Sequence, residues 1–218
     1  DTILAVAMTE PDAGSDLSGM RSTAKDMGDH FLLNGSKTYI SNGINADIVI
    51  VATKTNPEKN PYSLALLIVE RGMEGFERGR NLQKMGLKAQ DTSELFFHDV
   101  KVPKANVLGE PGKGFKYLME GLAEERLLGA VGYIASAQLS WDLTADYVKQ
   151  RKAFGKPLAA FQNTQFRLAD MRMQLDVAQS YVDQCVRAFA ADQLTAVDAA
   201  KAKLLASELS IAAADLGV

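Results

Sequence analysis

The stretch HFLLNGSKTYISNG (residues 30–43) decides the architecture of the N-terminal half of the chain. Phe31 and Leu33 alternate with other positions before the pair Asn34-Gly35, and a second Asn-Gly pair follows at residues 42–43. Such pairs favour tight hairpin turns because both residues tolerate a positive φ. We therefore predict two hairpin turns in this stretch, joining strands with an apolar face.

The segments that follow also have the composition of β-strands. DIVIVAT (47–53) and LALLIVE (64–70) are short, apolar and rich in β-branched residues, which is typical of strands covered on both faces. TSELFFHDVKVP (92–103) closes the region. We predict an antiparallel β-sandwich or open barrel over residues 1–111.

The periodicity changes after GEPGKG (109–114) to that of long helices. One apolar stripe with helical spacing contains Phe161, Leu168, Met171, Leu175, Ala178, Val182, Cys185 and Phe189. Cys185 lies within this stripe, which favours a small buried residue over a nucleophile. A further helix runs from about Thr195 to the end, and its predicted buried residues are Val197, Leu204, Leu205 and Ala212. Residues 112–218 are thus expected to form part of an antiparallel helical bundle, in a segregated α+β fold.

Composition excludes several classes of protein. The 218 residues carry a net charge of only −3 without a long block of one sign, which argues against a nucleic-acid partner. The single cysteine excludes an internal disulfide, and two distant histidines, His30 and His98, offer no metal site. No apolar run approaches the roughly 20 residues of a membrane span, and no secretory leader is present, so we expect a soluble protein that is not secreted. Both ends suggest a piece of a longer chain.

Two short motifs near the N-terminus are candidates for ligand binding. In AMTEPDAGSD (7–16), backbone N–H groups and the hydroxyl at Gly14 and Ser15 could face a ligand, although a plain turn closed by Asp12 or Asp16 explains the motif equally simply. In KTYISNG (37–43), Tyr39 could cover one face of a flat cofactor, although an aromatic residue in a strand is more often part of the core.

A third motif, QRKAFGKPLAAFQ (150–162), predicts the end of a helix. We place that end at Phe154, with Gly155 in the left-handed cap position and Pro157 preventing continuation. Capping leaves the closeness of Arg151 to a phenylalanine and to Gln162 unexplained. Those side chains could together hold a diphosphate and a ring edge.

The fourth motif, GLAEERLLGA (121–130), places Glu124, Glu125 and Arg126 where a helix is expected to begin. Two ordinary first-turn acids would each stabilise the helix by about 0.3–1 kcal/mol. Adjacent helical residues point about 100° apart, so the two carboxylates differ in their surroundings. Glu125 shares a face with Gly129 and Gly132, where there is room for a ligand, and a partly desolvated carboxylate there would be a stronger base.

Taken in this order, the motifs resemble the acyl-CoA dehydrogenase family along the whole chain. TEPDAGSD, LNGSKTYISNG and RKAFGKPLAAFQ are similar to its flavin-binding landmarks, and YLMEGLAEERLLGA and DYVKQRKAFGK are most similar to its long-chain members. The resemblance implies a middle β-domain followed by the first helices of a C-terminal four-helix domain. It also implies that an N-terminal helical domain is missing and that a glycine-rich flavin segment would follow AADLGV (213–218).

The resemblance also implies a set of site residues. Those implied to contact FAD are Val6, Ala7, Met8, Thr9, Glu10, Gly14, Ser15, Tyr39, Ile40, Ser41, Arg151, Phe154 and Gln162, with Arg151 and Gln162 reaching the FAD of a neighbouring subunit. The implied base is Glu125. The positions implied to line the acyl-CoA are Ser15, Tyr117, Ala123, Glu124 and Arg126. Medium-chain members have an aspartate where Ala123 stands, so the CoA contact there differs.

The implied reaction is FAD-dependent α,β-dehydrogenation of a long or branched acyl-CoA. Electrons would pass to an electron-transferring flavoprotein, and the enzyme would be a homodimer or homotetramer in a bacterial cytoplasm or a mitochondrial matrix. Two alternatives remain open. One is an acyl-CoA oxidase or flavin monooxygenase on the same scaffold, and the other is a truncated, non-catalytic assembly module.

Overall fold

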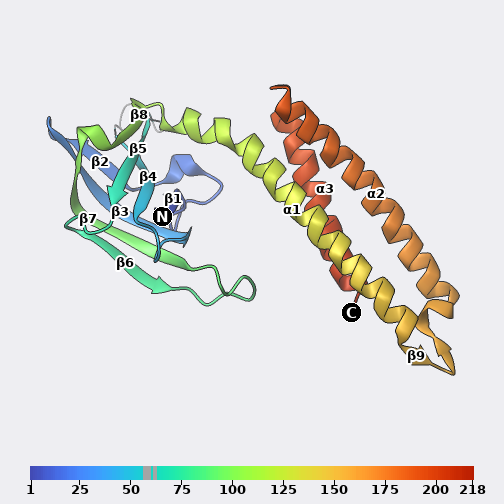
Figure 1. The fold of residues 1–218 in the computed structure, drawn as a ribbon. Helices are drawn as coiled ribbons and strands as arrows, with labels where there is room; N and C mark the ends of the chain where they lie inside the picture. The colour runs from blue at the N-terminus through green and yellow to red at the C-terminus, as the bar shows by residue number, and fades with distance from the viewer. Residues whose placement is uncertain (56–59, 61–62) are drawn as a thin grey trace. The chain divides into compact units, whose positions relative to one another are not determined.

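A computed structural model describes residues 1–55, 60 and 63–218, and the chain divides into two compact units (Figure 1). Residues 1–118 form a β unit, and residues 119–218 form a helical unit. The predicted segregated α+β fold is confirmed. The division falls inside helix α1 (Gly114–Gln150), whereas the sequence placed the boundary at residues 111–112.

The β unit is built on an eight-stranded sheet among the described residues. Its strands are β1 (Leu4–Ala7), β2 (Thr23–Asp26), β3 (His30–Ser41), β4 (Ile48–Lys54), β5 (Leu64–Glu70), β6 (Phe76–Asn81), β7 (Thr92–Pro103) and β8 (Val107–Gly112). Short 3-10 turns lie at Leu17–Gly19 and Lys104–Asn106. The order is β6-β7-β3-β2-β4-β5-β8, and β1 pairs in parallel with β4. A single residue pair, Thr23 with Lys54, joins the β2 side of the sheet to the β4 side.

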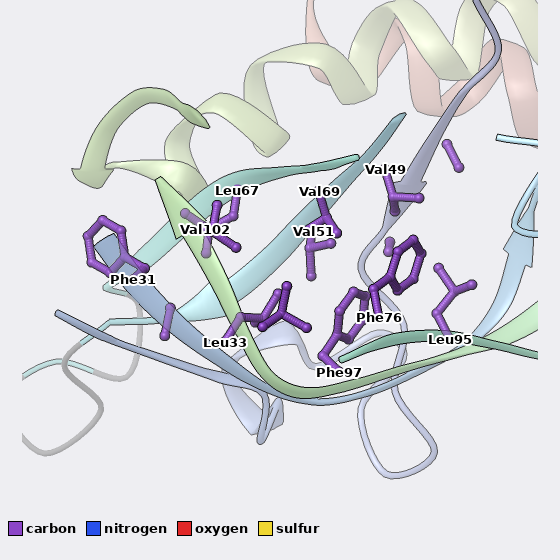
Figure 2. Packing of buried hydrophobic residues seen from close by; sticks show 14 of the residues in the cluster. Phe31, Leu33, Val49, Val51, Leu67, Val69, Phe76, Leu95, Phe97 and Val102 are labelled. Atoms are coloured by element: carbon purple, nitrogen blue, oxygen red, sulfur yellow. The ribbon is translucent and has the colours of Figure 1, made fainter. Parts of the chain in front are cut away.

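The main core of the β unit lies between two layers of this sheet (Figure 2). Leu33 from β3 and Phe97 from β7 point toward Val51 from β4 and Val69 from β5, and all four are buried. The rings of Phe76 and Phe97 stack with their centroids 5.1 Å apart. One sheet folded over an apolar interior is the architecture of the predicted sandwich or open barrel.

A second apolar cluster covers the other side of β4 and β5. Ala52 and Leu64 from these strands pack there with Ala13 and Met20 from the segment before β2. The partly buried Phe115, at the start of α1, packs against the same cluster. The prediction that these two strands are covered on both faces is therefore confirmed.

Of the two predicted turns, the one at Asn34-Gly35 is wrong, whereas a turn does form at Asn42-Gly43 but does not make a hairpin. Asn34-Gly35 lies within the continuous strand β3, at a register shift against β7, and forms a bulge. Gly35 has a φ of 144°, and a Cβ there would lie 2.3 Å from Ser22 Oγ on the adjacent chain segment. Asn42-Gly43 does end β3, but β4 then pairs with β1, β2 and β5 rather than turning back on β3.

The helical unit contains most of α1 with α2 (Gln162–Ala190) and α3 (Ala196–Leu216). Between α1 and α2 lie the short strands β9 (Lys152–Ala153) and β10 (Lys156–Pro157) and a 3-10 turn, Leu158–Ala160. Trp141 Nε1 of α1 donates to the Leu168 carbonyl of α2 at 2.9 Å. Among the residues that the structure describes, no helix is both long and apolar enough to cross a membrane.

The predicted stripe on α2 is confirmed at its centre, where Met171, Leu175, Ala178, Val182 and Cys185 are buried. The stripe predicted on α3 is wrong. Val197 and Leu204 are 61% and 57% exposed, and Leu205 and Ala212 also face outward. The buried residues of α3 are Ala199, Ala202, Ala206, Leu209 and Ala213. Alanines allow helices to approach closely, so the contact face of α3 is its small face rather than its most apolar one.

Candidate functional site

The structure brings together two of the sequence motifs in the β unit. The backbone N–H of Thr38, on β3, donates to the carbonyl of Thr9 at 2.9 Å. This bond joins the loop that follows β1 to the C-terminal end of β3. The motifs at residues 7–16 and 37–43, neither of which alone identifies a site, therefore share one edge of the β unit, beside the C-terminal end of β3.

Tyr39 stands out at this meeting point. The register between β3 and β7 shifts between Lys37 and Ile40, and Tyr39 within the shift has a φ of 57° and is 69% exposed. A left-handed backbone at a non-glycine residue costs of the order of 1–3 kcal/mol and is concentrated at functional sites. The strained bulge presents an aromatic ring outward, where it can stack on a planar ligand.

The predicted flavin residues of this edge divide by exposure. The side chains of Val6, Ser15, Tyr39 and Ser41 are exposed, Gly14 is open to solvent, and Met8 and Thr9 are half-buried. Ala7, Glu10 and Ile40 are buried, so their side chains do not face a ligand. An exposed ring flanked by hydroxyls and a glycine fits a planar heteroaromatic group with a polar edge, which is the chemistry of a flavin ring.

The Glu10 side chain is paired with the buried Lys37 and does not face outward. Its carboxylate accepts from Lys37 Nζ at 2.9 Å and from the backbone N–H groups of Ser22 and Arg21. Lys37 Nζ also donates to the Met8 carbonyl at 3.0 Å. Burial raises the pKa of Glu10, but the Lys37 ammonium and the donors at Arg21 and Ser22 outweigh burial and hold that pKa below its usual value. Lys37 was not among the residues predicted from the sequence.

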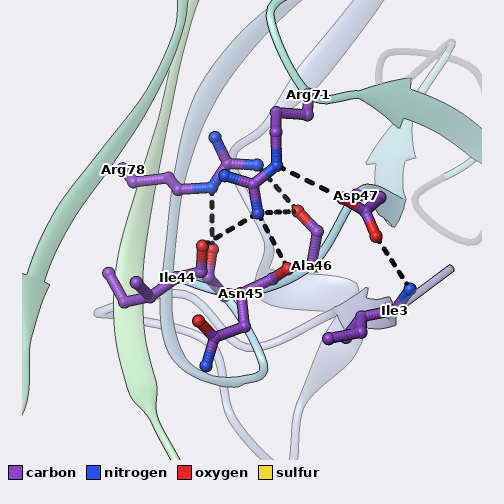
Figure 3. Close-up of polar contacts among 8 residues, drawn as sticks. Ile3, Ile44, Asn45, Ala46, Asp47, Arg71 and Arg78 are labelled. Atoms are coloured by element: carbon purple, nitrogen blue, oxygen red, sulfur yellow. Dashed lines mark hydrogen bonds and ion pairs between the residues drawn. The ribbon is translucent and has the colours of Figure 1, made fainter. Parts of the chain in front are cut away.

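The turn directly after Ser41 is held by two arginines from distant strand ends (Figure 3). Arg71 donates to the carbonyls of Ile44, Asn45 and Ala46, and Arg78 donates to those of Gly43 and Ala46. Asp91 accepts from the N–H of Ile44 at 2.8 Å. Burial, and then the charge of Arg71, lower the pKa of Arg78. No local sequence pattern predicts this arrangement, because Arg71, Arg78 and Asp91 reach the turn only in the folded chain.

On α1, the expectation that Glu124 and Glu125 begin the helix is wrong. The helix begins at Gly114, and its first turn carries no acidic residue. Glu125 and Gly132 are exposed, whereas the buried face of the helix contains Leu127, Ala130, Ile134 and Ala137. Glu125 therefore lies on the outer face with its glycines, and the partial desolvation expected for it is not provided by the helical unit.

Glu124 lies in different surroundings from Glu125. It lines a hollow of about 220 Å³ together with Ala123, Glu120, Phe189, Asp192 and Leu194. Helix geometry predicted that the two glutamates would differ, but it expected the space for a ligand beside Glu125, whereas this hollow lies beside Glu124. The carboxylates around the hollow repel phosphate, so this hollow does not itself suit the phosphates of CoA.

Arg151 and Phe154 lie at the end of α1. The helix ends at Gln150 rather than Phe154, because residues 152–153 pair with residues 156–157 in a small hairpin. Phe154 and Gly155 form its turn with φ values of 52° and 77°, and Phe154 is 95% exposed. Arg151 and Gln162 are exposed as well. The hairpin thus presents an arginine, a phenylalanine and a glutamine outward.

Tyr117 is the predicted substrate residue nearest the start of α1. The Tyr117 hydroxyl accepts from the Glu110 N–H at 3.3 Å, and its half-buried ring packs on the second cluster of the β unit. Within the described ranges, no group of three or more His, Cys, Asp or Glu residues is arranged to hold a metal ion.

Comparisons with known proteins cover both units. A family profile described as the acyl-CoA dehydrogenase middle domain matches residues 5–100, and one described as the acyl-CoA dehydrogenase C-terminal domain matches residues 112–218. Long-chain specific acyl-CoA dehydrogenase of Sus scrofa mitochondria is 48% identical over 94% of this chain and 48% of its own length. Mitochondrial isovaleryl-CoA dehydrogenase of Pongo abelii is 41% identical over 94% of this chain and 49% of its own.

The fold is shared with a solved structure of an acyl-CoA dehydrogenase from Geobacillus kaustophilus. It superimposes with a TM-score of 0.96 at 48% identity, covering 99% of this chain and 57% of that one. The chain spans about half the length of the curated relatives it matches.

Proposed function

The chain belongs to the acyl-CoA dehydrogenase family, and from that premise we propose that it forms part of an FAD-dependent enzyme that oxidises an acyl-CoA thioester between Cα and Cβ. The substrate class is a long or branched acyl-CoA. This choice is supported by the identity to a long-chain and an isovaleryl-CoA dehydrogenase.

One observation carries the proposal: the Thr38-to-Thr9 hydrogen bond joins two motifs around an exposed, strained Tyr39. In this proposal the edge formed by Val6–Glu10, Gly14, Ser15 and Tyr39–Ser41 receives the flavin ring. Tyr39 covers part of the ring, and the backbone and hydroxyls of Thr9, Ser15 and Ser41 bind its polar atoms. FAD, when bound, supplies the acceptor for the β-hydride.

Glu125 is the proposed base. A thioester α-proton is weakly acidic, so its removal needs a positioned carboxylate and hydrogen bonds to the carbonyl oxygen. The exposed position of Glu125 beside Gly129 and Gly132 leaves room for an acyl chain. Ser15, Tyr117, Ala123, Glu124 and Arg126 are the proposed residues along the acyl-CoA.

A second copy of the chain completes the proposed site. Arg151, Phe154 and Gln162 are exposed around the β9–β10 hairpin, and we assign them to the FAD of a neighbouring subunit in a homodimer or homotetramer. The guanidinium suits a diphosphate. An electron-transferring flavoprotein is the proposed electron acceptor. The proposed location is a bacterial cytoplasm or a mitochondrial matrix, and it is supported by similarity to mitochondrial relatives and to the Geobacillus kaustophilus protein.

The test is an anaerobic titration of FAD-reconstituted protein with acyl-CoAs of graded chain length. We expect the flavin absorbance to bleach with long or branched thioesters. A flavin that no thioester bleaches would contradict the proposed dehydrogenase activity of this chain.

Two further readouts separate the alternatives. Rapid reoxidation of the bleached flavin by oxygen would favour an oxidase or monooxygenase over a dehydrogenase. A protein that stays colourless after incubation with FAD would favour the non-catalytic assembly module.

A further inference from the structure

The ion pair between Lys37 and Glu10 is the most deeply buried polar contact at the proposed flavin edge. The two side chains are 0% and 5% exposed, and their nearest charged atoms lie 2.9 Å apart. Met20, whose sulfur lies 3.9 Å from Lys37 Nζ, belongs to the apolar cluster alongside. Lysine and glutamate are almost never fully buried without a partner.

The pair connects three segments of the chain. Lys37 comes from β3, its acceptors Met8 O and Glu10 Oε1 come from the loop after β1, and Glu10 in turn accepts from Arg21 and Ser22 before β2. Within the loop, Glu10 and Ala13 exchange backbone hydrogen bonds of 2.9 and 3.2 Å. Together the two side chains fix the path of the loop, Lys37 at its entry and Glu10 at its return.

The same lysine borders the strained bulge. Lys37 and Thr38 are consecutive buried residues on β3, which breaks the alternation of a regular strand. Because the strand bulges there, the Thr38 N–H turns away from β7 to meet Thr9, and Tyr39 is held outward. The ion pair and the bulge are therefore adjacent parts of one arrangement.

Stability alone gives little reason for such a pair. Replacing a buried ion pair by uncharged side chains of similar volume is often neutral or stabilising, because both charges must be desolvated. An ion pair differs from an apolar pair because its hydrogen bonds are directional. The three N–H donors of the ammonium group and the carboxylate oxygens each require a partner at a fixed place.

We propose that Lys37 and Glu10 are positioning residues that hold the Met8–Ser15 loop against the Tyr39 bulge in the arrangement to which the flavin binds. This inference rests on the proposed function. The pair acts through the backbone of Met8, Thr9 and Thr38, and neither charged group touches the cofactor.

The test compares the 218-residue chain with its Lys37→Met/Glu10→Gln double variant, which removes both charges and keeps the volumes. Amide hydrogen exchange of Ala13 and Thr38 without cofactor measures the position of the loop. FAD titration by flavin fluorescence measures binding. If the loop of the variant adopts the binding arrangement about a tenth of the time, its Kd for FAD rises about tenfold.

We expect faster exchange at both amides and this weaker FAD binding, with an unfolding midpoint close to that of the wild type. The matched control, Lys104→Met/Asp26→Asn, removes a less buried ion pair of the same unit and should leave FAD affinity unchanged. If the double variant does not fold, Lys37→Gln/Glu10→Gln, which also removes both charges but keeps hydrogen-bonding groups at both positions, should show the same exchange and affinity changes to a smaller extent.

Each outcome decides one question. Wild-type exchange rates and wild-type FAD affinity in the variant would overturn the inference and leave the proposed function intact. A wild-type chain that does not bind FAD would instead contradict the proposed function, while the exchange rates still report whether the pair positions the loop.

Discussion

Tyr39 and Asn42 have left-handed backbones with φ values of 57° and 63°. Asparagine tolerates this region, and Asn42 also donates from Nδ2 to the Leu4 carbonyl at 3.1 Å and accepts from Gln90 Nε2. Tyrosine has no such compensation, so the surrounding hydrogen bonds must hold it there. At the scale of single residues, the site edge is a strained backbone fixed by its neighbours.

Replacing Glu125 tests the assigned base. Glu125→Gln keeps the size of the side chain and removes its ability to accept a proton, so we expect the rate of flavin bleaching by acyl-CoA to fall by roughly 10²- to 10⁴-fold. Stopped-flow absorbance measures this rate. The matched control is Glu124→Gln, which should lose much less. Equal losses in the two variants would refute the assignment.

Gly35 tests the bulge in β3. Gly35→Ala forces a Cβ to within 2.3 Å of Ser22 Oγ at a φ of 144°, so we expect the free energy of unfolding to fall by at least about 1–3 kcal/mol. Urea unfolding followed by circular dichroism measures it. Gly86→Ala, where a Cβ meets nothing within 4 Å, should change stability little. Equal stability of the two variants would contradict the close approach.

Helix α3 shows how an element can bury its small face. Its buried residues are mainly alanines at helical spacing, while Leu204 and Ile211 are 57% and 72% exposed. Close packing of α3 on its neighbours therefore depends on the absence of bulk along one face. The large apolar residues on the other face remain available for contacts outside this chain.

Enlarging the small face of α3 should weaken the helical unit. Ala206 is fully buried, so Ala206→Leu overpacks the contact, and we expect a loss of about 1–3 kcal/mol in the free energy of unfolding. Thermal unfolding provides the measurement. Leu204→Ala, on the exposed face, should cost clearly less, and the reverse order would show that α3 packs through its larger residues.

Tyr181 predicts a pH dependence of the helical unit. Burial, then Cys185 and Asp198, raise the pKa of Tyr181 from 10.0 to about 12. A raised pKa in the folded state means that its contribution to stability is complete below pH 10 and is lost as the pH rises toward 12. Chemical denaturation across this range should show a steeper loss for the wild type than for Tyr181→Phe. Parallel profiles would contradict the shift.

For the whole molecule, the described helices leave large apolar residues exposed. On α1 these include Leu128, Leu139 and Leu143, with exposed fractions of 65%, 59% and 64%. Large exposed apolar side chains on one helix are candidates for a contact with another chain. Their exposure agrees with the proposed homo-oligomer.

Charging this surface should reduce self-association. We expect the double variant Leu139→Glu/Leu143→Glu to sediment as a smaller species than the wild type in analytical ultracentrifugation, because a charge buried in an apolar interface is costly. Gln184→Glu, at an exposed position on α2, is the control. An unchanged sedimentation coefficient in the double variant would place the oligomer contact elsewhere.

The sequence by itself determined the fold class, the two-part organisation and the family, because alternation, helical spacing and ordered motifs are local properties of the chain. It also predicted that Glu124 and Glu125 face different directions, since helix geometry depends only on their order, but it could not show which of them lies beside a hollow. The sequence did not predict the bulge at Gly35 and indicated a turn there instead. An Asn-Gly pair does not show which distant segment will pack against the glycine, and here that segment contains Ser22. The sequence indicated large residues for the buried face of α3 for a similar reason.

Only the tertiary structure decided which groups meet. Lys37 reaches Glu10 and Met8, and Arg71 and Arg78 reach the turn after Ser41, across separations in sequence that no spacing rule covers. The exposure of Tyr39 and its left-handed φ likewise arise only in the folded chain. The physical reason is that burial and hydrogen-bond partnership are properties of the packed chain, whereas strand and helix patterns are properties of short segments.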